Sequence, residues 1–276
     1  MSLLLAARFA RRELRAGLSG FRILIACLAL GVAAIAAVGS VRSALVEGLS
    51  SEGATLLGGD AEAEFTYRFA EPIERAWLES ISQKISEVVD FRSMIVVEGA
   101  QEQDYNLTQI KAVDTAYPLI GQVIIEDDIG FVEALSRKNG RDGVVLERVL
   151  ADRLGLELGD MLMIGIKPFR LGGILQSAPD SASDGFGLGP RTIVYKSSLE
   201  GAGLLEPGTL FSTKYRLKLI DGIDLETLSL DAKNRFENTG LRWRDARNAA
   251  PGISEFVDRL AIFLILVGLA GLAVGG

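Results

Sequence analysis

The side chains on which most enzyme chemistry depends are scarce in this chain. Its 276 residues include no histidine and one cysteine, Cys27. A Ser-His-Asp or Cys-His nucleophile therefore cannot be assembled, and neither can a Cys/His metal site or a disulfide within the chain. No Gly-Lys dipeptide occurs, which excludes the Walker A loop that holds ATP phosphates. The sequence thus predicts a protein that is not an enzyme, with no catalytic, cofactor or metal residues.

Three other patterns have chemical interpretations, and each has a simpler one. The glycines of residues 185–189 have the spacing of a phosphate loop, yet they follow no strand and open no helix, so we expect a surface loop. Residues 180–184 resemble the start of a calcium loop, but Arg191 occupies the position that requires glutamate. The acidic run 126–128 is typical of a solvated turn. Carboxylate pairs of the glycosidase kind are created by folding, and the sequence singles out none.

Charge is unevenly distributed along the chain. Five arginines and one glutamate lie before residue 23, which gives this stub a net charge of about +4. The whole chain carries −7, so the remainder carries about −11. Binding to a nucleic-acid backbone needs a basic surface, and we therefore expect no nucleic-acid partner.

An uncharged apolar run covers residues 23–41. At 1.5 Å per residue a helix of this length spans close to the roughly 30 Å hydrocarbon core of a bilayer, so we predict a transmembrane helix at 23–42. Two alternatives stay open. One is a cleaved signal peptide, since Ala34-Ile35-Ala36 resembles a cleavage site, and the other is a buried core helix.

The arginines also predict an orientation. Positive charge before a first span keeps the N-terminus in the cytoplasm, so the acidic part should lie outside the bacterial inner membrane. Residues 1–22 are predicted to form a cytoplasmic amphipathic helix that contacts the lipid bilayer. The candidate headgroup contacts are Arg8, Arg11, Arg12 and Arg15. The alternative is that these residues are only the basic flank of the span.

A second uncharged apolar run ends the sequence at residues 260–276. It is slightly short for a full span, so we expect the start of a second transmembrane helix (259–276) that continues beyond the sequence. Gly271 and Gly275 form a G-x-x-x-G pair, which permits close packing of helices in lipid. The pair is a weak candidate for helix packing, because glycine is common in such helices.

Between the two predicted spans, the pattern of residues 43–258 predicts a large extracytoplasmic α+β domain. Strict alternation at 61–68 indicates a half-buried strand, Pro72 suits the start of a helix, and Gly58-Gly59 suits the end of one. Similar signals predict the remaining elements. We expect strands at 61–68, 91–97, 107–113, 144–146, 161–166, 169–175, 192–195, 215–220 and 241–244, and helices at 43–57, 72–85, 148–154 and 225–236.

The order of these elements predicts two lobes. Residues 60–114 and 214–247 are each too short to bury both a helix and a sheet alone, so together they should form one split α+β lobe. A β-rich lobe at about 115–213 should be inserted into it. Trp77 and Ile81 should then be buried against the sheet of the split lobe.

Five stretches carry a resemblance to a known family. They are residues 11–17 with the apolar run that follows, 56–60, 145–160, 169–175 and 263–276. Over nearly its whole length the chain resembles the N-terminal portion of an FtsX-like, MacB-type ABC transporter permease, and it is most similar to the YbbP-type branch.

The resemblance implies a permease subunit that pairs with a separate cytoplasmic ABC ATPase, as a homodimer or pseudo-dimer of permeases. It implies a MacB-like periplasmic domain and export or extraction of an envelope substrate such as a lipid, lipoprotein or peptide. The alternative functions are a membrane-anchored signalling or binding module that senses an envelope partner, and an anchored enzyme of unrecognised type. The resemblance identifies neither the substrate nor the direction of transport.

Overall fold

The computed structural model describes residues 52–97, 105–181, 189–206 and 208–249, together with single residues of the two terminal segments. The chain divides into two units, residues 1–48 with 251–276 and residues 49–250. Among the described residues, no helix has both the length and the apolar character needed to cross a membrane. Most residues of the predicted spans at 23–42 and 259–276 lie outside this part of the chain. The unit of residues 49–250 is described below.

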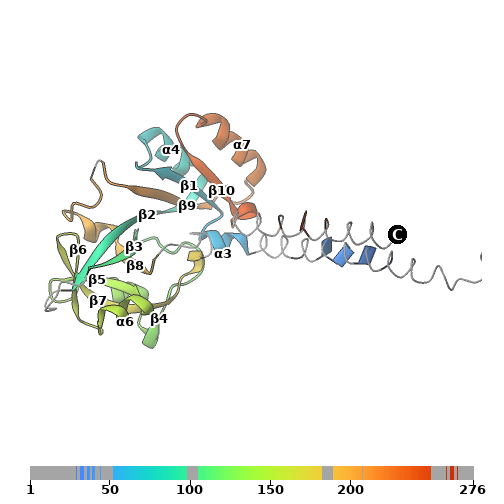
Figure 1. Ribbon diagram of the computed structural model, residues 1–276. Coiled ribbons are helices and arrows are strands. Elements are labelled where there is room, and N and C mark those ends of the chain that lie inside the picture. Colours follow the sequence, from blue (N-terminus) through green and yellow to red (C-terminus); the bar gives the residue numbers. More distant parts are fainter. Residues whose placement is uncertain are drawn as a thin grey trace, which may run out of the picture. The chain divides into compact units, whose positions relative to one another are not determined.

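The unit of residues 49–250 is built on one mixed sheet, which bears out the predicted α+β class (Figure 1). The strand order is β10-β1-β9-β2-β3-β8-β5-β7-β4, and β6 pairs with β2 and β7. Neighbouring strands are antiparallel except in the pairs β3/β8 and β5/β7. The strands are β1 (Ala61–Thr66), β2 (Ser82–Val97), β3 (Tyr105–Val113), β4 (Ile124–Ile125), β5 (Asp142–Glu147), β6 (Met161–Ile164), β7 (Lys167–Ser177), β8 (Arg191–Tyr195), β9 (Phe211–Leu219) and β10 (Arg242–Asp245). The helical segments are α3 (Gly53–Leu57), α4 (Pro72–Ile81), η1 (Glu126–Asp128), α5 (Phe131–Leu135), α6 (Arg148–Leu154), η2 (Pro179–Ser181), η3 (Lys196–Leu199), α7 (Leu225–Arg235) and η4 (Ala246–Asn248).

The first core joins segments from the two ends of this unit. β1 pairs with β9 on one side and with β10 on the other, so the strand predicted near 241–244 does join the sheet of β1. α4 and α7 lie together over this part of the sheet (Figure 1). Trp77 is buried among Phe236 and Trp243, and Ile81 is partly buried in the same core, as the sequence predicted.

Two further cores fill the rest of the unit. One contains Phe91, Ile110 and Phe169, and the other contains Val113 and Leu135. The long strand β2 runs from the first core, through its partly buried Ile85, into both of the others. Because β2 belongs to all three cores, the extent of a separate inserted lobe at about 115–213 stays a prediction.

The helix that starts at Pro72 is shorter than its apolar pattern predicted. The expected helix reached Ile85, whereas α4 ends at Ile81 and β2 starts at Ser82. β2 is held there by β9, since Ser82 pairs with Leu219. Ile85 therefore reaches the first core from a strand instead of a helix, and pairing with a distant strand overrides the local helical pattern. The other predicted strands and helices have counterparts at the same places in the described chain, and β4, η1 and α5 were not predicted.

Local rules set the ends of two helices that the sequence predicted. α6 ends at Gly155 and α3 ends at Gly58, and both glycines have the left-handed backbone conformation, with φ of 61° and 74°. Only glycine adopts this conformation without steric cost, so it commonly ends a helix. The predicted helix 43–57 ends with α3, and apart from Ala44 its residues 43–51 lie outside the described residues.

Candidate functional site

One face of β9 carries charged side chains that are buried inside the domain. Successive residues of a strand point to opposite faces, so Tyr215 and Leu217 lie in the first core while Lys214 and Arg216 point away from it. Arg216 is fully buried, which is rare for arginine. We call the buried ionisable side chains on this side of the sheet the charge layer. Its members are Glu62, Asp90, Lys111, Asp180, Lys214 and Arg216.

Asp180 is the shared partner of two cations of the charge layer. The Lys111 Nζ donates a hydrogen bond to Asp180 Oδ2 at 2.6 Å, and the Tyr117 hydroxyl donates to Oδ1 at 2.8 Å. The Arg216 guanidinium also contacts Oδ2. Lys111 comes from β3, Arg216 from β9 and Asp180 from η2, so this carboxylate ties the segment after β7 to two strands of the sheet.

Glu62 and Asp90 neutralise the remaining cations. The Arg216 Nε donates to Glu62 Oε2 at 3.3 Å, and Arg244 of the edge strand β10 contacts Glu62 Oε1. Lys214 Nζ lies 2.8 Å from Asp90 Oδ2. Taking a charge out of water costs several kcal/mol, and a buried pair recovers this only when its geometry is well matched. The layer therefore favours one relative position of β1, β3, β9, β10 and η2.

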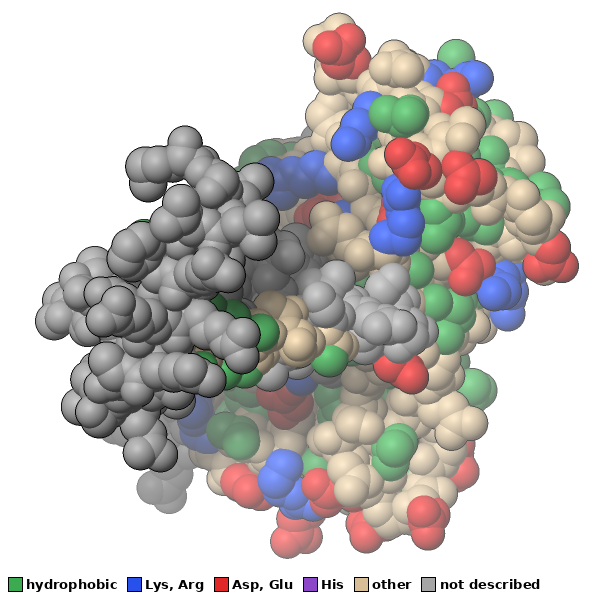
Figure 2. Space-filling model, turned by 90° about the vertical axis from the view of Figure 1, so that its right-hand side faces the viewer, with side chains coloured by type: hydrophobic (Ala, Val, Ile, Leu, Met, Phe, Trp, Pro, Cys, Tyr) green, Lys and Arg blue, Asp and Glu red, His purple; other side chains and the backbone are tan. Residues whose placement is uncertain are grey.

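Exposed charges are arranged differently. On the face of the molecule in Figure 2, acidic and basic side chains are interspersed over the described surface. Several exposed charges of the described chain are paired, for example Arg75 with Glu79 and Lys138 with Glu133. Such pairs contribute little, about 0–1 kcal/mol each. The charge layer is thus the place where ion pairs decide the packing.

α3 and η2 cover part of the charge layer. A Cβ at Gly58 would lie 3.3 Å from the Arg216 side chain and 3.4 Å from Asp180, so glycine lets the end of α3 approach the ion pairs closely. At Gly121 a Cβ would lie 2.5 Å from the Pro179 side chain, next to η2. Both glycines also have positive φ, which disfavours any other residue there.

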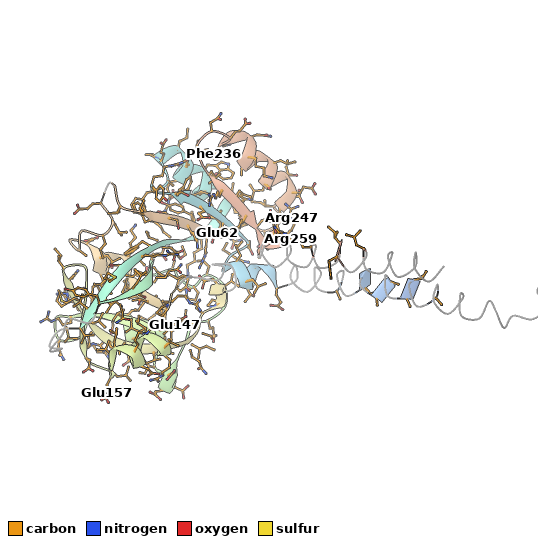
Figure 3. All side chains as sticks on the ribbon, in the orientation of Figure 1. Glu62, Glu147, Glu157, Phe236, Arg247 and Arg259 are labelled. Atoms are coloured by element: carbon orange, nitrogen blue, oxygen red, sulfur yellow. The ribbon has the colours of Figure 1, made fainter. Side chains whose placement is uncertain are left out.

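The chain enters and leaves the domain beside this layer. A Cβ at Gly53 would lie 1.8 Å from the backbone oxygen of Ala246, so α3 and η4 touch through their backbones. The Ala246 amide donates to the backbone oxygen of Asp60 at 3.0 Å. Glu62 of the charge layer follows Asp60 by two residues, near α3 (Figure 3). The segment that comes from residues 1–51 and the segment that leads to residues 250–276 are therefore joined to each other next to the buried ion pairs.

The charge layer is better suited to transmitting motion between segments than to making or breaking covalent bonds. In the part of the chain that the structure describes, no group of three or more His, Cys, Asp or Glu side chains is placed to hold a metal ion. Moving η2 away from the sheet would separate Asp180 from Lys111 and Arg216, which costs several kcal/mol, and moving α3 away would uncover these ion pairs. A displacement of the connections should therefore move the sheet with them, and the charge layer is our candidate functional site.

Few of the sequence-predicted site residues can be located in the structure. The headgroup candidates Arg8, Arg11, Arg12 and Arg15 lie outside the described residues, as do Gly271 and Gly275. Most of the glycine loop 185–189 lies outside them as well. The acidic run 126–128 forms the 3-10 turn η1, in which Glu126 pairs with Arg148. None of these groups belongs to the charge layer.

The charge layer itself was missed in the sequence. The sequence singled out residues 180–184 for their resemblance to the start of a calcium loop, yet Asp180 is fully buried in ion pairs. A faint signal exists in the alternating patterns of β1 and β9, which place glutamates on one strand and Lys214, Arg216 and Lys218 on the other. Alternation alone indicates a solvated face, so the pattern does not reveal that α3 and η2 cover it.

The comparison with protein families decides what kind of domain this is. Residues 23–234 match the model of the MacB-like periplasmic core domain. The chain belongs to this family. The match covers β1 through α7 and thus all six members of the charge layer in the MacB-like domain.

Individual relatives of the MacB-like domain are distant. The chain is 25% identical over 192 residues to the uncharacterized ABC transporter permease YbbP of Escherichia coli (strain K12), a match that covers 68% of this chain and 22% of YbbP. The chain thus spans about a fifth of the length of this curated relative. The periplasmic region of MacB from Actinobacillus actinomycetemcomitans is similar with 13% identity and a TM-score of 0.41, over 71% of this chain and 93% of that one. The extracellular domain of the ABC-type transporter YknZ from Gram-positive bacteria gives 12% identity and a TM-score of 0.42, over 67% and 98%.

Proposed function

We propose that this chain is the N-terminal portion of a permease subunit of an FtsX/MacB-type ABC transporter. The observation that carries the proposal is the match of residues 23–234 to the MacB-like periplasmic core domain. The matched region begins at the start of the first apolar run, which agrees with a domain that follows a transmembrane helix. In this proposal the N-terminus is cytoplasmic and the domain faces the outside of the inner membrane.

The permease would work with a separate cytoplasmic ATPase, as one copy of a permease homodimer or pseudo-dimer. The charge layer supports a role in coupling, because it lies beside both chain connections: Gly58 at the end of α3 packs against Arg216, and Arg244 of β10, the strand before η4, pairs with Glu62. ATP hydrolysis would drive motion of the membrane spans. This motion would reach β9 and β3 through α3, η4 and η2. The transported substrate would be a lipid, lipoprotein or peptide of the envelope.

Orientation can be measured with single cysteines in the full chain, expressed in cells with Cys27→Ser to remove the native thiol. Gly185→Cys should react with a membrane-impermeant maleimide in intact cells. Ser2→Cys should react only after the cells are permeabilised. Labelling of Ser2→Cys alone in intact cells would reverse the orientation and rule out this form of the permease.

Coupling can be measured with the whole permease and its ATPase in liposomes. Asp180→Asn should uncouple ATP turnover from transport, because it removes the shared anion of Lys111 and Arg216. The matched control is Asp152→Asn, an exposed acid on α6 whose side chain lies 3.6 Å from Arg148. A membrane-anchored signalling module would instead show no ATP-dependent transport, either in the parent chain or in the two variants.

A further inference from the structure

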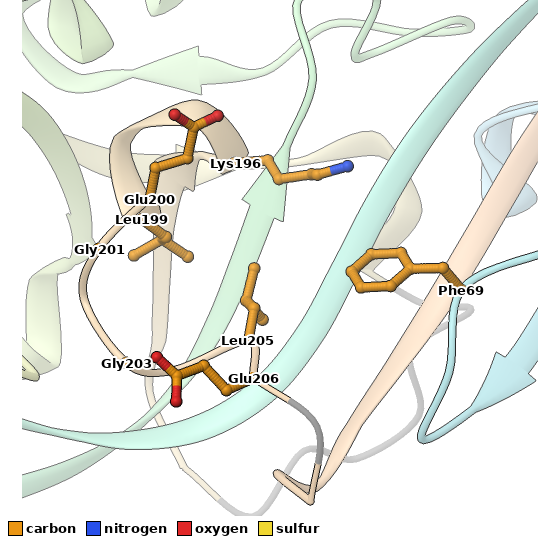
Figure 4. A pocket seen from close by; sticks show the side chains of 8 residues that line it. All are labelled: Phe69, Lys196, Leu199, Glu200, Gly201, Gly203, Leu205 and Glu206. Carbon is orange, nitrogen blue, oxygen red and sulfur yellow. The ribbon is translucent and has the colours of Figure 1, made fainter.

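A small cavity opens on the other side of the sheet from the charge layer. Its volume is about 270 Å³, and it lies between Phe69, from the segment that joins β1 to α4, and residues 196–206. Phe69 points across the opening toward Lys196 and Leu205 (Figure 4). Its ring also packs 5.1 Å from the ring of Phe211 on β9. The side chains around it are Phe69, Lys196, Leu199, Glu200, Leu205 and Glu206.

The inner wall of the cavity is apolar. Leu199 is buried in the core, and Phe69 and Leu205 pack against that core while staying partly accessible. Pockets that enclose drug-sized ligands have volumes of roughly 300–1,000 Å³. The cavity is smaller than these, so its size suits one large apolar side chain and not a whole ligand.

The rim of the cavity is acidic. Lys196 Nζ lies 2.5 Å from Glu87 Oε1, and it also lies 5.1 Å from the centre of the Phe69 ring, so its charge is already compensated. Glu200 and Glu206 are exposed, and no cation among the described residues forms an ion pair with either. The unmatched charge at the rim is therefore negative, which attracts cations and repels the phosphate of an anionic lipid.

Exposed apolar side chains continue this surface outside the cavity. Tyr67 and Leu210 are 61% and 72% exposed, and the Tyr67 amide donates to the backbone oxygen of Phe211 at 2.7 Å. Tyr67 has a positive φ of 61°, which is unfavourable for a bulky residue. These two side chains add exposed apolar area close in sequence to Phe69 and Phe211.

We propose that this cavity binds a basic peptide segment, with one large apolar side chain inside it and neighbouring Lys or Arg side chains at Glu200 and Glu206. The apolar wall and small volume account for the single inserted side chain. The acidic rim accounts for the preference for a basic peptide over a lipid. This inference does not depend on the direction of transport or on the charge layer.

The probe is a fluorescein-labelled peptide of sequence Lys-Phe-Lys-Leu-Lys, titrated against the full chain in neutral detergent by fluorescence anisotropy. The peptide should bind, and its affinity should fall as sodium chloride is raised, because the rim is exposed to solvent. The double variant Glu200→Lys with Glu206→Lys should weaken binding at least tenfold. Phe69→Ala should also weaken peptide binding, and the affinity of this variant should still fall as sodium chloride is raised.

The matched control is Glu157→Lys with Glu237→Lys, which reverses two exposed acids away from the cavity. These variants should bind the peptide like the parent chain. Two outcomes would overturn the proposal. One is equal binding of a control peptide in which Glu replaces every Lys. The other is unchanged peptide binding by the Glu200→Lys, Glu206→Lys double variant. Because the assay uses neither ATP nor an ATPase, its failure leaves the proposed permease function unaffected.

Discussion

The two sides of β9 are packed by opposite chemistry. On one side, Lys214 and Arg216 are buried in ion pairs that favour one relative position of the neighbouring strands. On the other side, Phe211 packs on Phe69 beside a small apolar cavity. Ion pairs need a fixed geometry, whereas apolar side chains tolerate small shifts. The comparison suggests that one side of the sheet sets its position and the other leaves room for a bound side chain.

The largest effect is expected from Asp180→Ala. The variant leaves Lys111 and Arg216 buried without their shared carboxylate, which costs about 3–5 kcal/mol of unfolding free energy. Urea denaturation of the full chain in detergent, followed by tryptophan fluorescence, measures the loss. The control Asp152→Ala removes an exposed acid and should change the free energy by less than about 0.5 kcal/mol. Equal losses in both variants would contradict the central role of Asp180.

A smaller effect is expected where the two connections meet. Gly53→Ala places a methyl group 1.8 Å from the backbone oxygen of Ala246, so α3 and η4 must separate. Overpacking of this kind costs about 1–3 kcal/mol. Gly130→Ala is the control, since its nearest neighbour would lie at 3.8 Å, and it should cost less than about 1 kcal/mol. Thermal unfolding of both variants tests the contact, and an unchanged midpoint for Gly53→Ala would refute it.

The apolar side should be more tolerant. Phe69 is only partly buried, so Phe69→Ala should cost about 1–2 kcal/mol, mostly from lost contact with Phe211. Urea denaturation of the full chain in detergent measures this loss of unfolding free energy, which is then compared with the loss in Asp180→Ala. If Phe69→Ala destabilises the domain more than Asp180→Ala does, the contrast between the two sides of β9 is wrong.

The smallest effect depends on pH. Burial would raise the pKa of Glu74, but hydrogen bonds from Arg68 and from the Glu71 amide outweigh it and hold this pKa below its usual value. A lowered pKa stabilises the folded state above the usual glutamate pKa of about 4.3, and this contribution is lost as pH falls through the lower folded value. Glu74→Gln should therefore cost about 1 kcal/mol at pH 7, and the difference from the parent chain should shrink below pH 4.

Unfolding midpoints between pH 7 and pH 3 measure this dependence. Glu79→Gln serves as the control, since Glu79 forms only an exposed pair with Arg75, and its effect should be small at every pH. A constant difference between Glu74→Gln and the parent chain across this range would show that the Glu74 charge does not contribute.

Local signals predicted much of the fold. Alternation identified β1, and the run from Arg148 to Gly155 identified α6 and its end, because strand period and glycine caps act within a few residues. The end of α4 was missed because Ser82 is held by Leu219, far along the chain. The burial of Asp180 was missed for the same reason, since its partners Lys111 and Arg216 come from distant strands.

The pairing of β1 with β9 and β10 also has a consequence for biosynthesis. Ala61 pairs with Leu217 and Asp245, so the neighbours of β1 are made about 160 and 180 residues later. At about 5–20 residues per second, the apolar side chains of β1 wait roughly 8–37 seconds for their partners. Throughout that interval the nascent strand offers an open edge to any other extended chain, so a holding chaperone that masks it should raise the yield of folded protein.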